Sequence, residues 1–440
     1  MTTALLLLFV VLLVVLAFEY INGFHDTANA IATVVSTKVL TPRQALVLAS
    51  ATNLIGAFCG QAVAKTIHSG IVDDKVVAVT TLTIFCAMLG GIIWNLITWW
   101  FGMPSSSTHA LVGGLIGASL AAANGNWNVL IWSREKVAAG KVSMEGIYHK
   151  VVIPMIGSPM MGITIGFLVM GLIFAVLSHW KPRITCPLTG LLGGLIGWFL
   201  PSWLLLFASW LLHFVAPLQT LSEKISHLNV PFFVHCLFCL LGFLALTSLC
   251  WRMGSWTPSK INSFFSKLQI FSAGYMGFGH GMADAQKTMG VIMLTLYGAT
   301  ASGDLDNLPS WLGFLKIADK SASIPMWIII TCALTMAAGT YAGGWRIIKT
   351  LGHKMGKMKP VHGFAAETTA ATILATTGAL GMPMSTTHTI TTSIMGVGAA
   401  KRSNAIQWSL VEQIVWAWVM TIPATGILGW VIYKFCGLFT

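Results

Sequence analysis

Charged residues, and acids above all, are scarce in this 440-residue chain. Asp and Glu together number 13, and charged residues make up 9% of the sequence, against about one quarter in ordinary soluble domains. Hydrophobic residues make up 56%, and the mean hydropathy is +0.79. This composition excludes a soluble enzyme, and it excludes a disordered chain, which needs high charge and low hydrophobicity. We therefore expect an integral membrane protein that has the lipid bilayer as a partner.

Signatures of enzymes, metal sites and nucleic-acid binding are also missing. The sequence has no His-Glu-x-x-His pair, no P-loop and no Gly-x-Ser-x-Gly element. Cys236-x-x-Cys239 has no second pair of ligands at a suitable spacing for zinc. The 25 Lys and Arg residues are scattered through short loops, so loop charge bias explains the net charge of +12 better than nucleic acid does. We predict no enzyme activity, no cofactor and no nucleic-acid partner.

Long apolar runs follow one another from residue 4 to residue 436, with short polar connections between them. Because a spanning helix needs about 20 apolar residues, the chain has room for about 10–12 spans. We predict an all-α polytopic membrane protein. The purely basic loops Arg252–Lys267 and Arg346–Lys359 should be cytoplasmic. The loop 134–150 carries both acids and bases, and its side is left open.

An internal repeat is the most informative pattern in the sequence. Gly102-Met-Pro-Ser-Ser-Ser-Thr-His109 returns as Gly381-Met-Pro-Met-Ser-Thr-Thr-His388, with six of eight positions identical. Each copy follows a polar segment that carries an acid in otherwise apolar surroundings, Asn22–Asn29 in the first case and His280–Lys287 in the second. Duplicated, interrupted segments of this kind point to the binding site of a secondary transporter.

The repeat also suggests how the chain is organised. We predict two inverted repeats with broken helices at the site. Residues 1–215 would form the N-terminal repeat with peripheral helices, 216–267 a connecting segment, and 268–440 the C-terminal repeat.

Each Pro-containing copy indicates a helix N-terminus at membrane depth, since Pro, Ser and Thr favour the first turn of a helix. The free N–H groups and the helix dipole at such an end attract an anion. A hydroxyl-rich contact between membrane helices is the alternative. The hydroxyl groups that we expect to bind the anion belong to Ser106, Ser107, Thr108, Ser385, Thr386 and Thr387.

An acid inside the membrane is a functional candidate by default, because burying its charge is costly. Asp26 and Asp284 occupy matched positions in the repeat. Asn22 and Asn29 place amide groups around the first acid, as a bound cation or a proton relay would require. Lys287 could balance Asp284 or the anion, or it could form a structural ion pair with Asp284.

Two histidines and a glutamate extend the set of coupling candidates. His25 and His280 lie in the acid-bearing segments and could carry protons near neutral pH, or serve only as structural contacts. Glu367 could cap a helix at the membrane interface or lie deep enough to exchange a proton. The candidates for the coupling ion or proton are Asn22, His25, Asp26, His280, Asp284 and Glu367.

At these residues the chain resembles the inorganic phosphate transporter family often called PiT, in particular its bacterial low-affinity branch. The resemblance rests on Gly23-Phe-His-Asp-Thr-Ala-Asn-Ala30, on Asp284-Ala-Gln-Lys-Thr-Met-Gly290 and on the two Pro-containing motifs, in the right order over nearly the whole chain. It implies a symporter in the bacterial inner membrane that imports inorganic phosphate, either free or as a metal–phosphate complex that would include a divalent metal, and it is compatible with a homodimer. The substrate-binding residues would be Asp26, Asn29, Ser106, Ser107, Thr108, Asp284, Lys287, Ser385, Thr386 and Thr387.

Departures from the family pattern bear on the coupling ion. Ala283 precedes Asp284 where the family usually has Asn, and His25 precedes Asp26 in the first half. Sodium-coupled members often carry Asn-Asp in both halves, so we favour protons over Na⁺. Phosphate can donate a proton to a carboxylate near neutral pH, whereas sulfate cannot. Phosphate import is thus the favoured function, and the alternatives are a Na⁺-coupled phosphate symporter, a sulfate permease of the same fold and an anion channel.

Overall fold

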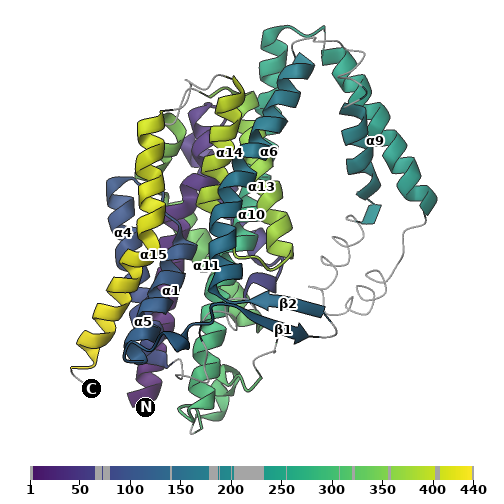
Figure 1. The fold of residues 1–440 in the computed structure, drawn as a ribbon. Coiled ribbons are helices and arrows are strands. Elements are labelled where there is room, and N and C mark those ends of the chain that lie inside the picture. The colour runs from purple at the N-terminus through teal and green to yellow at the C-terminus, as the bar shows by residue number, and fades with distance from the viewer. Residues whose placement is uncertain are drawn as a thin grey trace. The chain divides into compact units, whose positions relative to one another are not determined.

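The structure is a computed structural model of the chain, and helices dominate the part of it that is described (Figure 1). The described residues are 3–64, 72, 80–138, 141–177, 187, 189–199, 201–202, 232–253, 255–306, 308–319, 323–354, 358–401 and 407–438. The predicted boundary between residues 215 and 216 lies outside them.

The first half of the repeat and the region after it contribute the elements up to α9. These are α1 (Thr3–Ser36), α2 (Pro42–Ala57), α4 (Thr81–Phe101), α5 (Ser107–Ala122), a 3₁₀ turn (Trp127–Val129), β1 (Arg134–Ala138), β2 (Lys141–Glu145), a π-helical turn (Tyr148–Val152), α6 (Ile153–Leu177) and α9 (Phe232–Met253). The later elements are α10 (Pro258–Ala301), a 3₁₀ segment (Ser310–Leu315), α11 (Met326–Ala342), α12 (Trp345–Lys349), a π-helical turn (Thr350–Lys354), α13 (Pro360–Ala379), α14 (Thr386–Lys401) and α15 (Trp408–Cys436).

The chain divides into two compact units. Unit 1 contains Met1–Met170 and Phe264–Thr440, and it carries both copies of the repeated motifs. Unit 2 contains Gly171–Ser263, where α9 packs on the short helix Thr189–Phe199. This division follows contacts, whereas the predicted division at residues 215 and 267 follows the sequence repeat and stays a prediction.

Several helices are long and apolar enough to cross a membrane. Among the described residues there are five of them, or six if the bent pair of α11 and the segment after it is one span. The remaining helices of the bundle are shorter or carry more polar residues, α10 among them. The chain is therefore a helical integral membrane protein, and the count of 10–12 spans stays a prediction.

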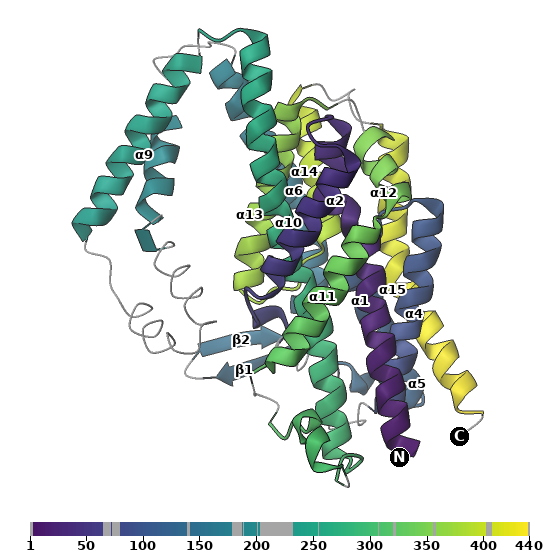
Figure 2. The same cartoon turned by 180° about the vertical axis from the view of Figure 1, so that it is seen from behind.

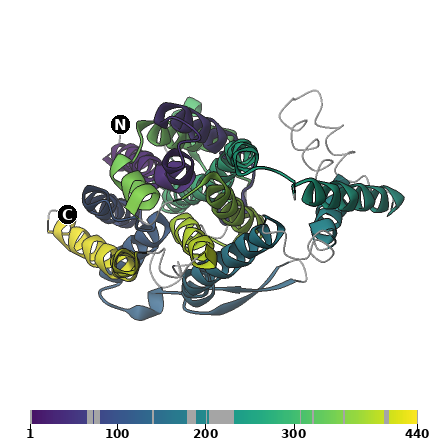
Figure 3. The same cartoon turned by 90° about the horizontal axis from the view of Figure 1, so that it is seen from above.

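Within unit 1, α1 is a central helix. It packs on α2, α4, α11, α13 and α14, and Figure 2 shows α1 and α11 side by side. α5 packs against both α4 and α15. Figure 3 looks along the helices of this unit and shows them as a bundle seen end-on. Polar side chains on α1 are consequently shielded by protein.

The matched helices α1 and α10 run antiparallel. Glu19, midway along α1, contacts Thr288 in the second half of α10, whereas Thr37 just after α1 contacts Gln269 in the first half of α10. Each helix continues unbroken through its acid-bearing segment. An antiparallel arrangement of matched helices is what an inverted repeat requires, while the inversion of the complete halves stays a prediction.

Both Pro-containing motifs break the chain between two helices. α4 ends before Gly102 and α13 ends shortly before Gly381, and these two glycines have left-handed φ angles of 66° and 68°. The residue after each glycine donates its N–H back into the helix, Met103 to the Thr98 carbonyl at 2.8 Å and Met382 to the Thr377 carbonyl at 2.9 Å. This pairing ends the helix by satisfying carbonyls that would otherwise have no partner.

A new helix begins a few residues after each glycine. α5 starts at Ser107 with Ser106 as its cap, and the Ser106 hydroxyl oxygen accepts the His109 N–H at 3.3 Å. α14 starts at Thr386, and the Ser385 hydroxyl oxygen accepts the His388 N–H at 3.2 Å. The predicted broken helices are thus present at the two Pro-containing motifs.

The loop 134–150 contains a small β-hairpin that the sequence did not predict. β1 and β2 pair antiparallel, with Arg134 opposite Glu145. Arg134 and Glu145 form an ion pair across the two strands at 3.7 Å. The side of the membrane on which the loop lies stays open.

The left-handed glycines lead to a stability prediction. Gly102→Ala and Gly381→Ala should each lower the thermal unfolding midpoint of the detergent-purified protein, because a side chain in this conformation costs about 1–2 kcal/mol. Gly157→Ala is the control, since it lies inside α6 with no atom within 4 Å of an added Cβ. It should be neutral or stabilising by up to about 1 kcal/mol. Equal midpoints for all three variants would contradict the assigned role of the two glycines.

Candidate functional site

The N-termini of α5 and α14 meet at the centre of unit 1. The rings of His109 and His388, one in each first turn, contact edge to face with centroids 4.8 Å apart. From this point α5 and α14 extend in opposite directions (Figure 1). Two positive helix ends therefore converge on one place, as the sequence motifs predicted.

Asp26 on α1 lies beside the start of α5. Its Oδ2 accepts a hydrogen bond from the Ser107 hydroxyl at 2.9 Å, and its Oδ1 lies 2.7 Å from His25 Nδ1. The other ring nitrogen of His25 lies 3.1 Å from the Thr98 hydroxyl in the last turn of α4. The carboxylate is thus held by a helix start and by its own sequence neighbour.

Asp284 on α10 lies beside the start of α14. The Thr386 hydroxyl donates to its Oδ2 at 3.1 Å, and His280 Nε2 lies 3.1 Å from the same oxygen. The Lys287 ammonium forms a short ion pair with its Oδ1. His280 Nδ1 lies 3.3 Å from the Asn53 side-chain oxygen on α2.

The remaining contacts cross between the two halves. Asn29 donates to the hydroxyls of Thr386 and Thr387, at 3.3 and 3.0 Å, and Lys287 donates to the Thr108 hydroxyl. Lys287 is the repeat counterpart of Asn29, and Thr108 is the counterpart of Thr387. The two halves therefore make matching contacts, with Lys in one where the other has Asn.

The site is closed to solvent in this conformation. The side chains that form its centre have at most 3% of their surface exposed, and they belong to Asp26, Asn29, Ser107, Thr108, Asp284, Lys287, Thr386 and Thr387. A buried charge is tolerated only when it is paired and hydrogen-bonded. The hydroxyls, the histidines and the Lys287 ammonium around the two aspartates meet that requirement.

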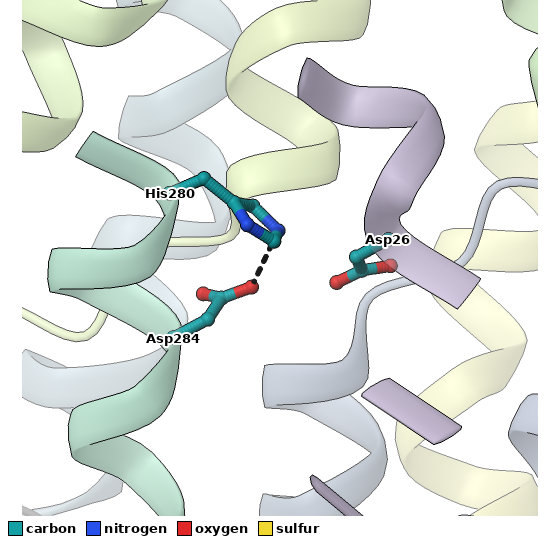
Figure 4. A group of neighbouring side chains, drawn as sticks. All are labelled: Asp26, His280 and Asp284. Atoms are coloured by element: carbon teal, nitrogen blue, oxygen red, sulfur yellow. Dashed lines mark ion pairs between the residues drawn. The ribbon is translucent and has the colours of Figure 1, made fainter. Parts of the chain in front are cut away.

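Asp26, His280 and Asp284 form a compact cluster across the α1–α10 interface (Figure 4). One side-chain nitrogen or oxygen atom from each of them lies within 4.8 Å of those of the other two. Two carboxylates and an imidazole at this spacing can share protons, and they are also of the types that bind a divalent metal ion.

Four predicted residues lie at the edge of this centre or away from it. Ser106 and Ser385 are within the two motifs, but their oxygens serve as helix caps, so their contact with a substrate stays a prediction. Asn22 lies one turn before Asp26 and donates to Glu19 at 3.4 Å. Glu367 lies in α13, fully buried.

The environment of Glu367 resolves one question that the sequence left open. Its carboxylate accepts short hydrogen bonds from Thr33 on α1 and Ser272 on α10, and a third from Gln269 at 3.2 Å. It therefore lies deep within the helix bundle and does not cap a helix at the interface.

Sequence reasoning missed Glu19, Thr33, Gln269, Ser272 and Asn53. A signal for the first two was present, because Glu19, Asn22, Asp26, Asn29 and Thr33 recur at alternating steps of three and four residues. That spacing places them on one face of a helix. Gln269, Ser272 and Asn53 contact their partners only through tertiary packing, so no local pattern could have identified them.

Comparisons with known proteins agree over the whole chain. The phosphate transporter family matches residues 22–429. A protein of Rhizobium meliloti (strain 1021), named probable low-affinity inorganic phosphate transporter, is 35% identical over 433 residues, which cover 98% of this chain and 97% of that protein. A protein of the same name from Bacillus subtilis (strain 168) is 32% identical over 433 residues and 98% of each chain.

A solved structure described as the sodium-dependent phosphate transporter superimposes with a TM-score of 0.75, over 99% of this chain and 100% of that one. Its sequence identity is 22%, so this likeness concerns the fold. The relatives are named as transporters and not as enzymes, in agreement with the prediction from sequence. The resemblance found in the motifs is confirmed, and the chain belongs to the phosphate transporter family.

Proposed function

We propose that this chain is a secondary active symporter that imports inorganic phosphate together with protons, by alternating access across a bacterial inner membrane. The observation that carries the proposal is the convergence of two helix N-termini on a buried site that contains two aspartates and one lysine. Helix ends and hydroxyls can bind a tetrahedral oxyanion without arginine. The names of the bacterial relatives support phosphate as that anion.

The acids of the site support phosphate over sulfate. Asp26 and Asp284 can accept protons from monobasic phosphate, whereas sulfate has none to donate and a carboxylate repels it. Ser107, Thr386 and the Lys287 ammonium lie next to these carboxylates and can donate to the remaining phosphate oxygens. The closed site supports a carrier over an anion channel, which needs a continuous pore.

The surroundings of the aspartates support protons as the coupling ion. His280 has one nitrogen beside the Asp284 carboxylate and the other beside the Asn53 oxygen, so both nitrogens face acceptors. Asn53 uses its amide nitrogen to donate to Thr340 at 2.9 Å, which fixes the orientation of its oxygen. The imidazole is a titratable group next to the Asp284 carboxylate, at 3.1 Å, where it can exchange a proton with that acid. The Lys287 ammonium already pairs with Asp284, so the protein itself supplies a cation beside that carboxylate.

Two variants of this function have observations in their favour. Na⁺ coupling is suggested by the name of the structural relative. Cotransport of a divalent metal as a neutral metal–phosphate complex is suggested by the close spacing of Asp26, His280 and Asp284. If the protein carries a metal–phosphate complex, vesicles that contain the protein would take up labelled Mg²⁺ and phosphate in equal amounts, and a chelator would stop both fluxes.

Purified protein in proteoliposomes tests the proposal directly. An inward pH gradient should drive uphill, saturable uptake of labelled phosphate, and an inward Na⁺ gradient at equal pH should not. Excess sulfate should leave the uptake unchanged. Uptake driven by a Na⁺ gradient alone would identify Na⁺ as the coupling ion in place of the proton. Inhibition by sulfate would favour a sulfate permease, and downhill flux that does not saturate would indicate a channel.

Substitutions at Asp284 and Lys287 separate transport from folding. Asp284→Asn should abolish phosphate uptake, but it leaves the Lys287 charge buried without its partner, which costs about 3–5 kcal/mol. The double variant Asp284→Asn with Lys287→Gln removes both charges and should recover the amount of folded protein, measured by size-exclusion chromatography, without recovering uptake. Uptake near the wild-type rate in the double variant would mean that the pair is only structural.

Glu412→Gln is a matched control for these substitutions, because Glu412 is an exposed acid on α15. It changes a carboxylate to an amide at an exposed position, whereas the acids of the site are buried. Its uptake should equal that of the wild type.

A further inference from the structure

A stripe of buried polar residues runs along α1, and it extends beyond the phosphate site on both sides. Glu19, Asn22, Asp26, Asn29 and Thr33 each have at most 1% of their surface exposed. Their alternating spacing of three and four residues places them on one helix face. The stripe carries an acid at its centre and another at its N-terminal end.

Three carboxyl groups lie in order along this stripe. Glu19 is seven residues before Asp26, and Thr33, which holds Glu367, is seven residues after it. At 1.5 Å per residue, each step is about 10 Å along the helix axis. Glu19 and Glu367 therefore flank the phosphate site from opposite directions.

The two flanking carboxyl groups differ in how completely they are bonded. Both oxygens of Glu367 accept hydrogen bonds, Oε1 from Thr33 and Gln269 and Oε2 from Ser272. At Glu19, the hydroxyl of Thr288 and the amide nitrogen of Asn22 both donate to Oε2. Within the part of the chain that the structure describes, Glu19 Oε1 and Asn22 Oδ1 have no hydrogen-bond partner.

Two buried acceptor oxygens without a donor are costly, because neither water nor protein compensates for their lost hydration. The amide of Asn22 cannot simply be turned around, since its oxygen would then face the Glu19 carboxylate. A proton on the carboxyl group removes its buried negative charge, and a neutral carboxyl group costs less to bury than a carboxylate that has one oxygen without a donor. A hard metal cation needs more oxygen ligands than the two unpartnered ones here.

We propose that Glu19 is a second proton-carrying group of the transport cycle, which takes a proton from water on one side of the membrane and releases it to water on the other. This proposal rests on the proton coupling proposed above. The titratable groups that interact electrostatically with Glu19 are Asp284 and Lys287 on α10 and the Cys332 thiol on α11. Bound phosphate adds negative charge next to Asp284, and this charge favours a proton on Glu19. The positive charge of Lys287 disfavours that proton. Phosphate binding and proton uptake are thereby linked.

The test compares Glu19→Gln with Glu412→Gln in proteoliposomes under a pH gradient of one unit, with the membrane potential clamped at zero. Each proton coupled to phosphate multiplies the steady-state accumulation ratio by about ten, since a tenfold gradient is about 1.4 kcal/mol. Glu19→Gln should therefore accumulate phosphate to a ratio about tenfold lower than the wild type, and Glu412→Gln should match the wild type. An unchanged ratio in Glu19→Gln overturns the proposal.

Exchange of labelled for unlabelled phosphate at equal pH shows whether the variant protein still works. Gln is a permanently neutral substitute for protonated Glu, so exchange should persist in Glu19→Gln while accumulation falls. A wild-type protein without any pH-driven uptake would instead refute the coupling mechanism itself, before any variant is considered.

If Glu19→Gln loses exchange as well, Thr288 gives an independent test. Thr288→Val removes the hydroxyl that donates to the Glu19 carboxylate. It should move the alkaline limb of the pH profile of phosphate uptake to higher pH, because the charged form of the carboxyl loses a stabilising hydrogen bond. Thr288→Ser keeps the hydroxyl and should keep the wild-type profile. Identical profiles for the Val and Ser variants overturn the proposal.

Discussion

Two carboxylates buried where water cannot reach them are the constraint on which the rest of this structure depends. Asp26 and Asp284 would each be prohibitively costly without partners. The fold supplies these partners from four helices: a hydroxyl from the start of α5 or α14, a histidine from the same helix as each aspartate and, at Asp284, the Lys287 ammonium. The breaks before α5 and α14 bring free N–H groups to this depth, which the interior of a continuous helix cannot do, and they place hydroxyls beside the aspartates.

The two long helices make this arrangement possible by staying unbroken. α1 and α10 run antiparallel and present polar faces to each other over many turns. The acids are therefore fixed on continuous helices, while the hydroxyls that face them lie at helix ends next to left-handed glycines. The site therefore lies between two continuous helices and two helix ends.

Much of this could be predicted from the sequence, because the determinants were local. Pro-Ser-Ser-Ser-Thr-His and its second copy each specify a helix start through their own caps, and duplication made the pair recognisable. The scarcity of acids singled out Asp26 and Asp284. The surroundings of Glu367 could not be predicted, since Thr33 and Ser272 come from helices distant in sequence. Glu19 directly follows a long apolar run, and its spacing of seven residues from Asp26 is the sequence signal that places it on the same helix face.

Asn29 in one half corresponds to Lys287 in the other half of the repeat, and this difference affects the relative energies of the transporter's conformations. Suppose that the two halves of the repeat were identical and exchanged conformations during transport. The inward-facing and outward-facing forms would then have equal energy. A single ammonium group on one side removes that degeneracy, since its attraction to Asp284 and Thr108 has no equivalent at Asn29. If the halves exchange conformations as proposed, the resting protein favours one orientation, and any added negative charge that competes for the ammonium changes that preference.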